Sequence, residues 1–204
     1  METRRIIALS FAAVLAFSAA MAADRKKKSP EEEKLEDLNE LAGRYNKLTL
    51  DAELSEEQRF IHARVAELLE RAREAPAKSY IFDRLESAID DLLDGSGEIR
   101  KVREPDEDEA KEDRERNAQS RTARELERAY FRVKQGDYFG KLSGDSRAQE
   151  YVRVAGRLYQ HGRQAYDSQR FWRARRYADA AREVIDSLES LAQAAVPVPE
   201  PPEL

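Results

Sequence analysis

The helical spacing of apolar residues between Ser146 and Ala195 constrains this chain more than any other feature of its sequence. Apolar residues recur every three or four positions on both sides of a short polar break at residues 167–170. That spacing puts each set on one side of an α-helix, so each helix has an apolar stripe to bury. Because the break is short, we expect the two helices to lie antiparallel as a hairpin. The two stripes are Ala148, Tyr151, Val152, Ala155, Leu158, Tyr159, Gly162, Ala165 and Tyr166, and then Phe171, Ala174, Tyr177, Ala178, Ala181, Val184, Ile185, Leu188 and Leu191.

Three further amphipathic helices are predicted in residues 29–95, an N-terminal unit. Residues 29–32, Ser-Pro-Glu-Glu, combine a capping hydroxyl, a first-turn proline and acidic side chains, which mark a helix start. Ser55 followed by Gln58 is a second start signal, and Pro76 should end or kink that helix. Gly95 is placed to end the third helix. We expect an antiparallel three-helix bundle. Its stripes are Leu35, Leu38, Leu41, Ala42 and Tyr45; Ile61, Val65, Leu68, Leu69 and Ala72; and Ile81, Leu85, Ala88, Ile89 and Leu92.

A charged stretch, residues 96–120, separates this unit from a C-terminal helical unit at residues 121–195. From Gly95 onward the apolar stripe is lost, and most residues of 104–116 are charged, with both signs mixed. Such a stretch cannot fold alone, so it is either a linker or a solvated helix. Whether the two units pack together is left open by the sequence. A fourth stripe opens the C-terminal unit, and Gly136, Gly140 and Gly144 are expected to break that helix into a loop. The fourth stripe is Ala123, Leu126, Ala129, Tyr130 and Val133.

Both ends of the chain are expected to lie outside the fold. Arg4-Arg5, an apolar run at residues 6–20 and Ala20-Met21-Ala22 predict a signal peptide, residues 1–22, cleaved after Ala22. The alternative, a membrane anchor, is disfavoured because the run is shorter than the roughly 20 residues that a span needs. We therefore expect a periplasmic or secreted protein without a transmembrane span after cleavage. Residues 23–28 should be a basic, disordered stub. Residues 196–204 should be an extended Pro-rich tail, either a docking peptide or an exit from the domain.

No constellation of residues points to catalysis. The chain has no cysteine, which removes disulfides, thiolate metal sites and cysteine nucleophiles. Its two histidines, His62 and His161, lie in different units, and neither follows a glutamate three residues earlier, as di-iron helical bundles require. Phosphate-binding and dinucleotide-binding glycine motifs are also missing. We expect a non-enzymatic protein with no cofactor and no metal; a carboxylate-bridged metal bundle is the enzymatic alternative.

The best candidate for function is a local excess of arginine in the hairpin. Nine arginines lie between Ser146 and Arg182 with only three carboxylates, in a chain of net charge −5, and aromatic residues are interleaved. Arginine binds carboxylate and phosphate groups through its planar fork. The alternative is that the aromatics form the core and the arginines cover the acidic N-terminal unit. The candidate partner-binding residues are Arg163, Arg170, Trp172, Arg173 and Arg176.

Two resemblances bear on function. Tyr159 and Tyr166, with Ala174 and Ala181, are similar to the packing positions of a tetratricopeptide-type helical hairpin, and Gly136-Asp137-Tyr138 resembles the turn between such repeats. This resemblance implies a helical protein-interaction surface. Residues 54–58, Leu-Ser-Glu-Glu-Gln, resemble the Leu-Thr-x-x-Gln motif of periplasmic chaperones of the Spy and CpxP type, although a helix cap explains the same residues.

We therefore expect an exported, non-catalytic binding or scaffolding protein that uses the Arg/aromatic face of the hairpin. Its partner would be a protein or an anionic envelope polymer, while nucleic acid is excluded by export. A chaperone-like envelope stress protein is the alternative. The sequence does not indicate an oligomeric state.

Overall fold

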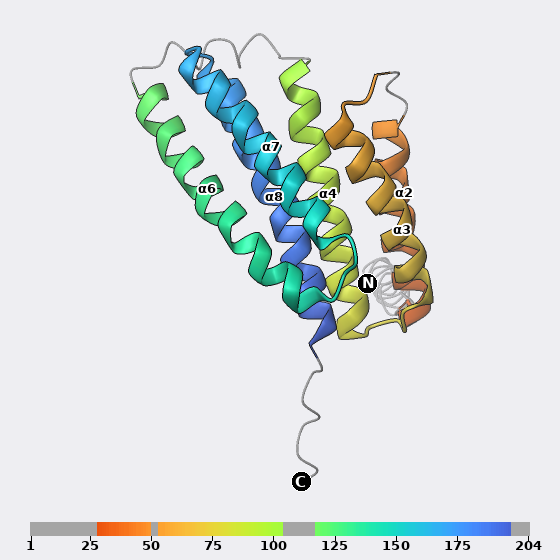
Figure 1. The fold of residues 1–204 in the computed structure, drawn as a ribbon. Coiled ribbons are helices and arrows are strands. Elements are labelled where there is room, and N and C mark those ends of the chain that lie inside the picture. Colours follow the sequence, from red (N-terminus) through yellow and green to blue (C-terminus); the bar gives the residue numbers. More distant parts are fainter. Residues whose placement is uncertain (1–27, 50–52, 104–116, 197–204) are drawn as a thin grey trace, which may run out of the picture. The chain divides into compact units, whose positions relative to one another are not determined.

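The computed structural model describes residues 28–49, 53–103 and 117–196, and every regular element in these ranges is a helix. The predicted all-α class is confirmed. Residues 34–204 form one compact unit, and residues 1–33 form another, of which only 28–33 are described. The predicted signal peptide, all but the last residue of the basic stub, residues 104–116 and the tail from residue 197 lie outside the described residues. The helices are α2 (Pro30–Thr49), α3 (Glu56–Glu74), α4 (Tyr80–Arg103), α6 (Ala118–Ser143), α7 (Ala148–Asp167) and α8 (Phe171–Ala195) (Figure 1).

The predicted start signals of the first two helices are confirmed. The backbone N–H of Glu32 donates to the Ser29 hydroxyl at 3.2 Å, and the Glu32 carboxylate accepts from the N–H of Ser29 at 2.8 Å. Ser55 and Gln58 form the same reciprocal pair at 3.2 and 3.1 Å before α3. These pairs satisfy N–H groups that have no partner inside the helix. Pro76 follows the end of α3 closely, as expected.

The expectation that Gly95 ends the third helix was wrong, because α4 continues to Arg103. At Gly95 an added Cβ would lie 3.3 Å from Cβ of Glu183 in α8, so the glycine permits a close helix contact. Ile99 and Val102 are buried beyond it. The apolar stripe therefore extends to the end of α4 instead of stopping at Gly95.

The expectation that Gly136 and Gly140 break the fourth helix was also wrong. Both lie inside α6, which ends at Ser143 and is capped by Gly144 in the left-handed conformation with φ 61°. A Cβ on Gly136 would lie 2.9 Å from Ile185 Cδ1 and 3.0 Å from Val152 Cγ2. Gly136 therefore serves close packing of α6 on its neighbours, and the tetratricopeptide-like turn expected at residues 136–138 is helix.

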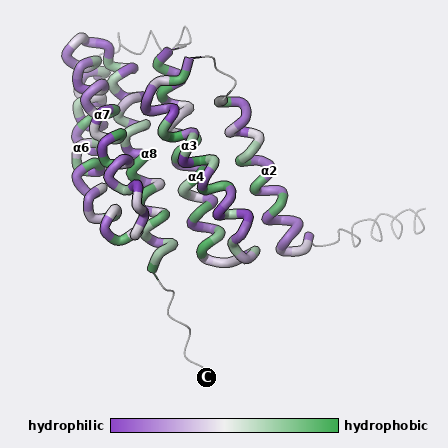
Figure 2. The backbone as a smooth tube through the Cα atoms, turned by 45° about the vertical axis from the view of Figure 1, so that its right-hand side comes forward, coloured by the Kyte–Doolittle hydropathy of each residue, from purple (hydrophilic) through white to green (hydrophobic). Residues whose placement is uncertain are grey.

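One large core cluster joins residues from both sides of the charged stretch. α8 packs against α4, α6 and α7, while α3 packs against α4. The largest core cluster runs from Leu38 in α2 to Leu191 in α8 and includes α3, α4 and α7. Figure 2 shows hydrophobic positions recurring along these helices. The question that the sequence left open is thus answered within residues 34–196, where the helices of the two predicted units share one core.

Four residues assigned to buried stripes are exposed. Leu35 and Ile81 retain 60% and 48% of their accessible surface, Tyr130 retains 42%, and Ala123 is also exposed. For Ile81 the reason is a shift by one position, because the adjacent Phe82 is buried instead. On α6, Leu126 and Ala129 of the predicted stripe are buried, and only Ala123 and Tyr130 are exposed.

Helix α2 buries Leu38 and Leu41 in this core and also forms polar contacts with α3 and α4. The Lys34 ammonium donates to the carbonyls of Arg73 and Ala75, at 2.7 and 2.5 Å, at the end of α3. Arg44 forms ion pairs with Asp90 and, at 2.6 Å, with Asp94 of α4. Among the described helices, none is long and apolar enough to cross a membrane.

Candidate binding surface on the C-terminal helices

The predicted hairpin is present, with its turn where the sequence placed it. α7 ends at Asp167 and α8 begins at Phe171. The N–H of Arg170 donates to the Ala165 carbonyl at 2.9 Å, and Gln169 takes the left-handed conformation with φ 59°. The turn therefore holds Arg170 and the first turn of α8 beside the last turn of α7.

Among the described residues, four of the nine hairpin arginines form ion pairs with carboxylates of other helices. Arg176, a predicted site residue, lies 3.0 Å from Glu98 of α4, and both side chains are largely buried. This is the alternative that the sequence allowed, in which arginines cover the acidic helices. Arg176 is therefore a structural residue. The other pairs are Arg147–Glu67 at 2.8 Å, Arg157–Glu56 at 2.9 Å with Arg157–Glu57 at 3.3 Å, and Arg182–Glu125 at 3.1 Å.

Trp172, another predicted site residue, is buried with 6% of its surface exposed. As a candidate partner-binding residue, Trp172 would need an accessible ring, which this burial contradicts. The Arg173 guanidinium lies 5.3 Å from the centre of the Trp172 ring and covers it. Arg173, not Trp172, is consequently the side chain that can meet a partner here.

Arg170 and Arg173 line a hollow of about 280 Å³ between the ends of α4, α7 and α8, which we call the cationic hollow. No carboxylate is among its described lining residues, and Arg170 forms no ion pair in the described part of the chain. The His161 ring packs against the Tyr177 ring with centroids 5.4 Å apart. Burial raises the pKa of the Tyr177 hydroxyl, opposed by the charge of Arg173. The remaining lining residues are Val102, Gln164, Ala165 and Ser168.

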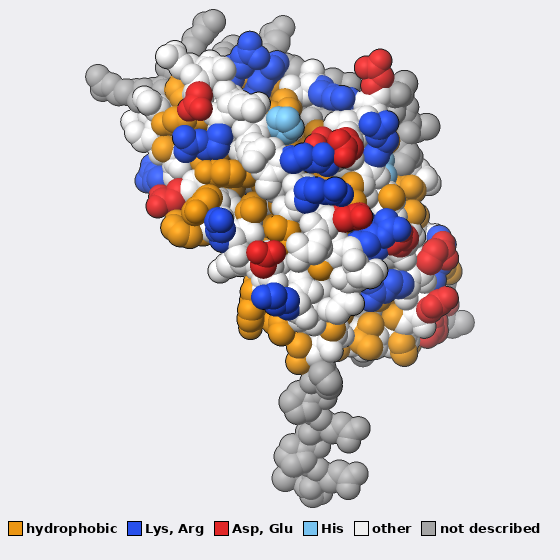
Figure 3. All heavy atoms as spheres, in the orientation of Figure 1, with side chains coloured by type: hydrophobic (Ala, Val, Ile, Leu, Met, Phe, Trp, Pro, Cys, Tyr) orange, Lys and Arg blue, Asp and Glu red, His pale blue; other side chains and the backbone are white. Residues whose placement is uncertain are grey.

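Arg163 lies apart from the other predicted arginines, on a groove of about 360 Å³ between α6 and α7. We call it the aromatic groove. Tyr130 and Phe131 are exposed at 42% and 59%, and the rings of Tyr130 and Tyr159 lie 5.8 Å apart. Figure 3 shows hydrophobic side chains gathered over α6. The groove is lined by Ala123, Leu126, Glu127, Tyr130, Phe131, Tyr159, Arg163 and Tyr166. The periodicity had assigned Tyr130 to the core and gave no signal for Phe131.

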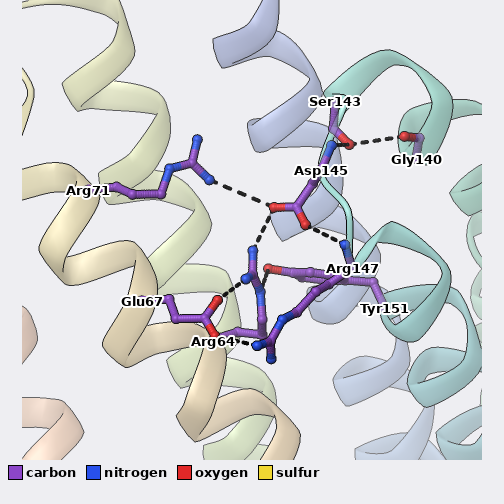
Figure 4. A network of polar contacts seen from close by, with 8 residues as sticks. All are labelled: Arg64, Glu67, Arg71, Gly140, Ser143, Asp145, Arg147 and Tyr151. Carbon is purple, nitrogen blue, oxygen red and sulfur yellow. Dashed lines mark hydrogen bonds and ion pairs between the residues drawn. The ribbon is translucent and has the colours of Figure 1, made fainter.

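A buried polar network ties α3 to the loop before α7 (Figure 4). The Arg64 side chain, 5% exposed, donates to Asp145 at 2.6 Å and to the Tyr151 hydroxyl at 3.1 Å, and it also pairs with Glu67. Asp145 additionally accepts from the N–H of Arg147 at 2.8 Å. Burial raises the pKa of Tyr151. A hollow of about 490 Å³ lies beside this network. Because these partners satisfy one another, we interpret the network as structural; no sequence pattern indicated Arg64.

Two carboxylates at the contact of α4 and α8 are partly removed from water. Burial, together with the charge of Asp186, raises the pKa of Asp91 to about 7 and that of Glu183 to about 7. The Ser190 hydroxyl donates weakly to Asp91 at 3.4 Å. Among the described residues no group of three or more histidines and carboxylates could hold a metal ion. The carboxylate-bridged metal bundle therefore gains no support.

Comparison with known protein families, with curated proteins and with solved structures finds no match to this chain. The tetratricopeptide resemblance of the hairpin therefore stays a prediction. The function must be inferred from the surfaces themselves.

Proposed function

We propose that this chain is an exported, non-catalytic binding module that takes an anionic partner, an acidic protein surface or an anionic envelope polymer, at the cationic hollow. The observation that carries the proposal is the contrast between two sets of hairpin arginines. Those that lie over the body of the bundle are neutralised by carboxylates of α3, α4 and α6. Arg170 and Arg173 instead line a hollow with no carboxylate among its described lining residues.

The chemistry of the hollow suits carboxylate or phosphate groups. Each guanidinium offers a fork of donors that can bind an oxyanion in bidentate fashion. Ser168, Gln164 and His161 add further polar groups beside them. Since Arg170 is exposed, each contact is weak and sensitive to salt, so useful affinity requires a partner with several anionic groups. This favours a polymer or an acidic protein surface over a single small anion.

The test uses the chain without its predicted signal segment, residues 23–204, and two defined probes, polyglutamate and polyphosphate. Binding is measured by titration calorimetry at low and physiological salt. The hollow variant carries Arg170→Glu and Arg173→Glu. The matched control carries Arg124→Glu and Arg153→Glu, which change the charge equally at exposed positions outside the hollow.

We expect saturable binding of at least one probe that weakens about tenfold or more in the hollow variant and little in the control. Equal weakening in both variants would show that binding depends only on the net charge of the chain, and would refute the site. Absence of binding to either probe at low salt would refute the proposed function.

The chaperone alternative gains no specific support. It needs an exposed, concave apolar surface on the N-terminal helices. The described hollow between α2 and α4 is instead polar, lined by Asp37, Glu40, Leu41, Arg44, Glu86, Ser87 and Asp90. The chaperone-like residues 54–58 hold the cap of α3.

A further inference from the structure

We propose that the aromatic groove binds the proline-rich segment Pro199-Glu200-Pro201-Pro202 of a second copy of this chain. This site is separate from the cationic hollow and rests on different residues. Its ligand class is a polyproline II peptide that carries an acidic residue.

The groove has the chemistry that such a peptide requires. Prolines in the polyproline II conformation pack on aromatic rings, and the backbone carbonyls of that helix have no internal partners. Tyr130, Phe131, Tyr159 and Tyr166 supply rings on both walls, and tyrosine hydroxyls can donate to carbonyls. The floor is closed by Leu126, which clusters with Ala129, Ala174 and Ala178. The groove is therefore apolar at its base and polar at its edges.

The spacing along α7 matches the spacing of the segment. Tyr159, Arg163 and Tyr166 lie on one side of α7 and span about 10 Å at 1.5 Å per residue. Pro199 and Pro202 are three residues apart, about 9 Å in polyproline II. A proline can thus meet each tyrosine while Glu200 lies between them, opposite Arg163.

The charges support the same alignment of the segment along α7. Arg163 is exposed and forms no ion pair in the described part of the chain. The segment offers Glu200 as its partner. Glu127, the other charged lining residue, comes from α6, whereas Arg163 comes from α7.

The segment must come from another copy because its own groove is out of reach. The groove lies level with Ala174 and Ala178 of α8, so it is roughly 30 Å along the helix from Val196. Pro202 follows Val196 by six residues and can extend only about 19 Å from it in polyproline II. The proline segment of one copy would therefore bind the aromatic groove of another copy, as a head-to-tail contact.

The test measures binding of a fluorescently labelled synthetic peptide, residues 196–204, to the chain of residues 23–204 by anisotropy. Phe131→Ala and Arg163→Glu alter exposed groove residues. Tyr138→Ala alters an exposed aromatic of the same helix outside the groove, at 62% exposure, and serves as the matched control. A second peptide carries Pro199→Ala and Pro202→Ala. Circular dichroism confirms that each variant is folded.

We expect saturable binding that weakens about tenfold or more with Phe131→Ala, with Arg163→Glu and with the second peptide, but not with Tyr138→Ala. Sedimentation of the whole chain should show self-association that excess peptide reverses. Binding lost only in the Arg170→Glu, Arg173→Glu variant would place the peptide in the cationic hollow and overturn the proposal. So would equal binding of both peptides, no binding, or self-association that survives removal of both prolines.

Discussion

Replacement of Gly162 by alanine tests the tightest helix contact at the base of the aromatic groove. A Cβ at this position would lie 3.1 Å from Leu126 Cδ2, 3.2 Å from the carbonyl oxygen of Ala174 and 3.4 Å from Tyr177 Cβ. The leucine methyl can rotate away, but the Ala174 oxygen belongs to the backbone of α8. Accommodating the methyl group therefore requires α7 and α8 to separate by a few tenths of an ångström.

The size of the effect follows from two opposing contributions. Alanine gains about 1 kcal/mol over glycine in a helix interior, while overpacking a close contact costs about 1–3 kcal/mol. We expect Gly162→Ala to lower the free energy of unfolding by about 1 kcal/mol. Gly156→Ala, in the same helix but with no described neighbour outside the local helix backbone within 4 Å of the added Cβ, should raise the free energy of unfolding by about 0.5–1 kcal/mol.

The measurement is urea unfolding followed by circular dichroism. The unfolding free energies of the two variants and the parent are compared with a common slope of free energy against urea concentration. Gly162→Ala should also weaken peptide binding in the groove, because Gly162 lies between Tyr159 and Arg163 in α7. If Gly162→Ala stabilised the chain as much as Gly156→Ala, the close approach of α7 and α8 would be refuted.

Three further expectations follow from buried groups. Tyr151→Phe removes the acceptor of the buried Arg64 Nε and should lower the unfolding free energy by about 1–2 kcal/mol in the same urea assay; no loss would mean that water replaces the hydroxyl. Asp91 binds its proton more tightly when folded, so stability should rise as pH falls from above about 7 toward 4. Asp91→Asn should flatten that pH dependence and raise the free energy of unfolding at pH 8 by about 1–2 kcal/mol, a value that discounts the pKa shift for partial solvent access. An unchanged pH profile would refute the burial of this carboxylate. Trp172, the sole tryptophan, should emit at short wavelength and resist iodide quenching until the chain unfolds; strong quenching in the native state would contradict its burial.

Local signals in the sequence predicted the helices well. Capping pairs at Ser29 and Ser55, the proline after α3 and the three-to-four spacing of α7 and α8 act within a few residues, so a linear sequence displays them. The all-α class and the position of the hairpin turn follow from such signals. They are also the features least dependent on what packs against them.

What could not be predicted depends on neighbours distant in sequence. Gly136 has the local properties of a helix breaker, but here it permits contact with Ile185 and Val152. Arg176 has the local properties of an exposed charge, and only the approach of Glu98 from α4 identifies it as structural. The prediction for Trp172 failed for the same reason, because the local sequence does not show that its ring is buried. Of the predicted site residues, Arg170 and Arg173 share one surface and Arg163 belongs to another.

The C-terminal half of α7, with its C-cap Ser168, carries both proposed surfaces on roughly opposite sides. His161, Gln164 and Ser168 face the cationic hollow, whereas Tyr159, Arg163 and Tyr166 face the aromatic groove. Positions two residues apart in a helix are separated by about 200° around its axis, so the two sets alternate without sharing a side chain. Since α7 is fixed on α8 along its length, occupation of one surface need not move the other. Substitutions in one surface should therefore leave binding at the other surface unchanged. A chain altered in both should lose affinity for the anionic partner and for the proline segment by the same factors as the two single-surface variants.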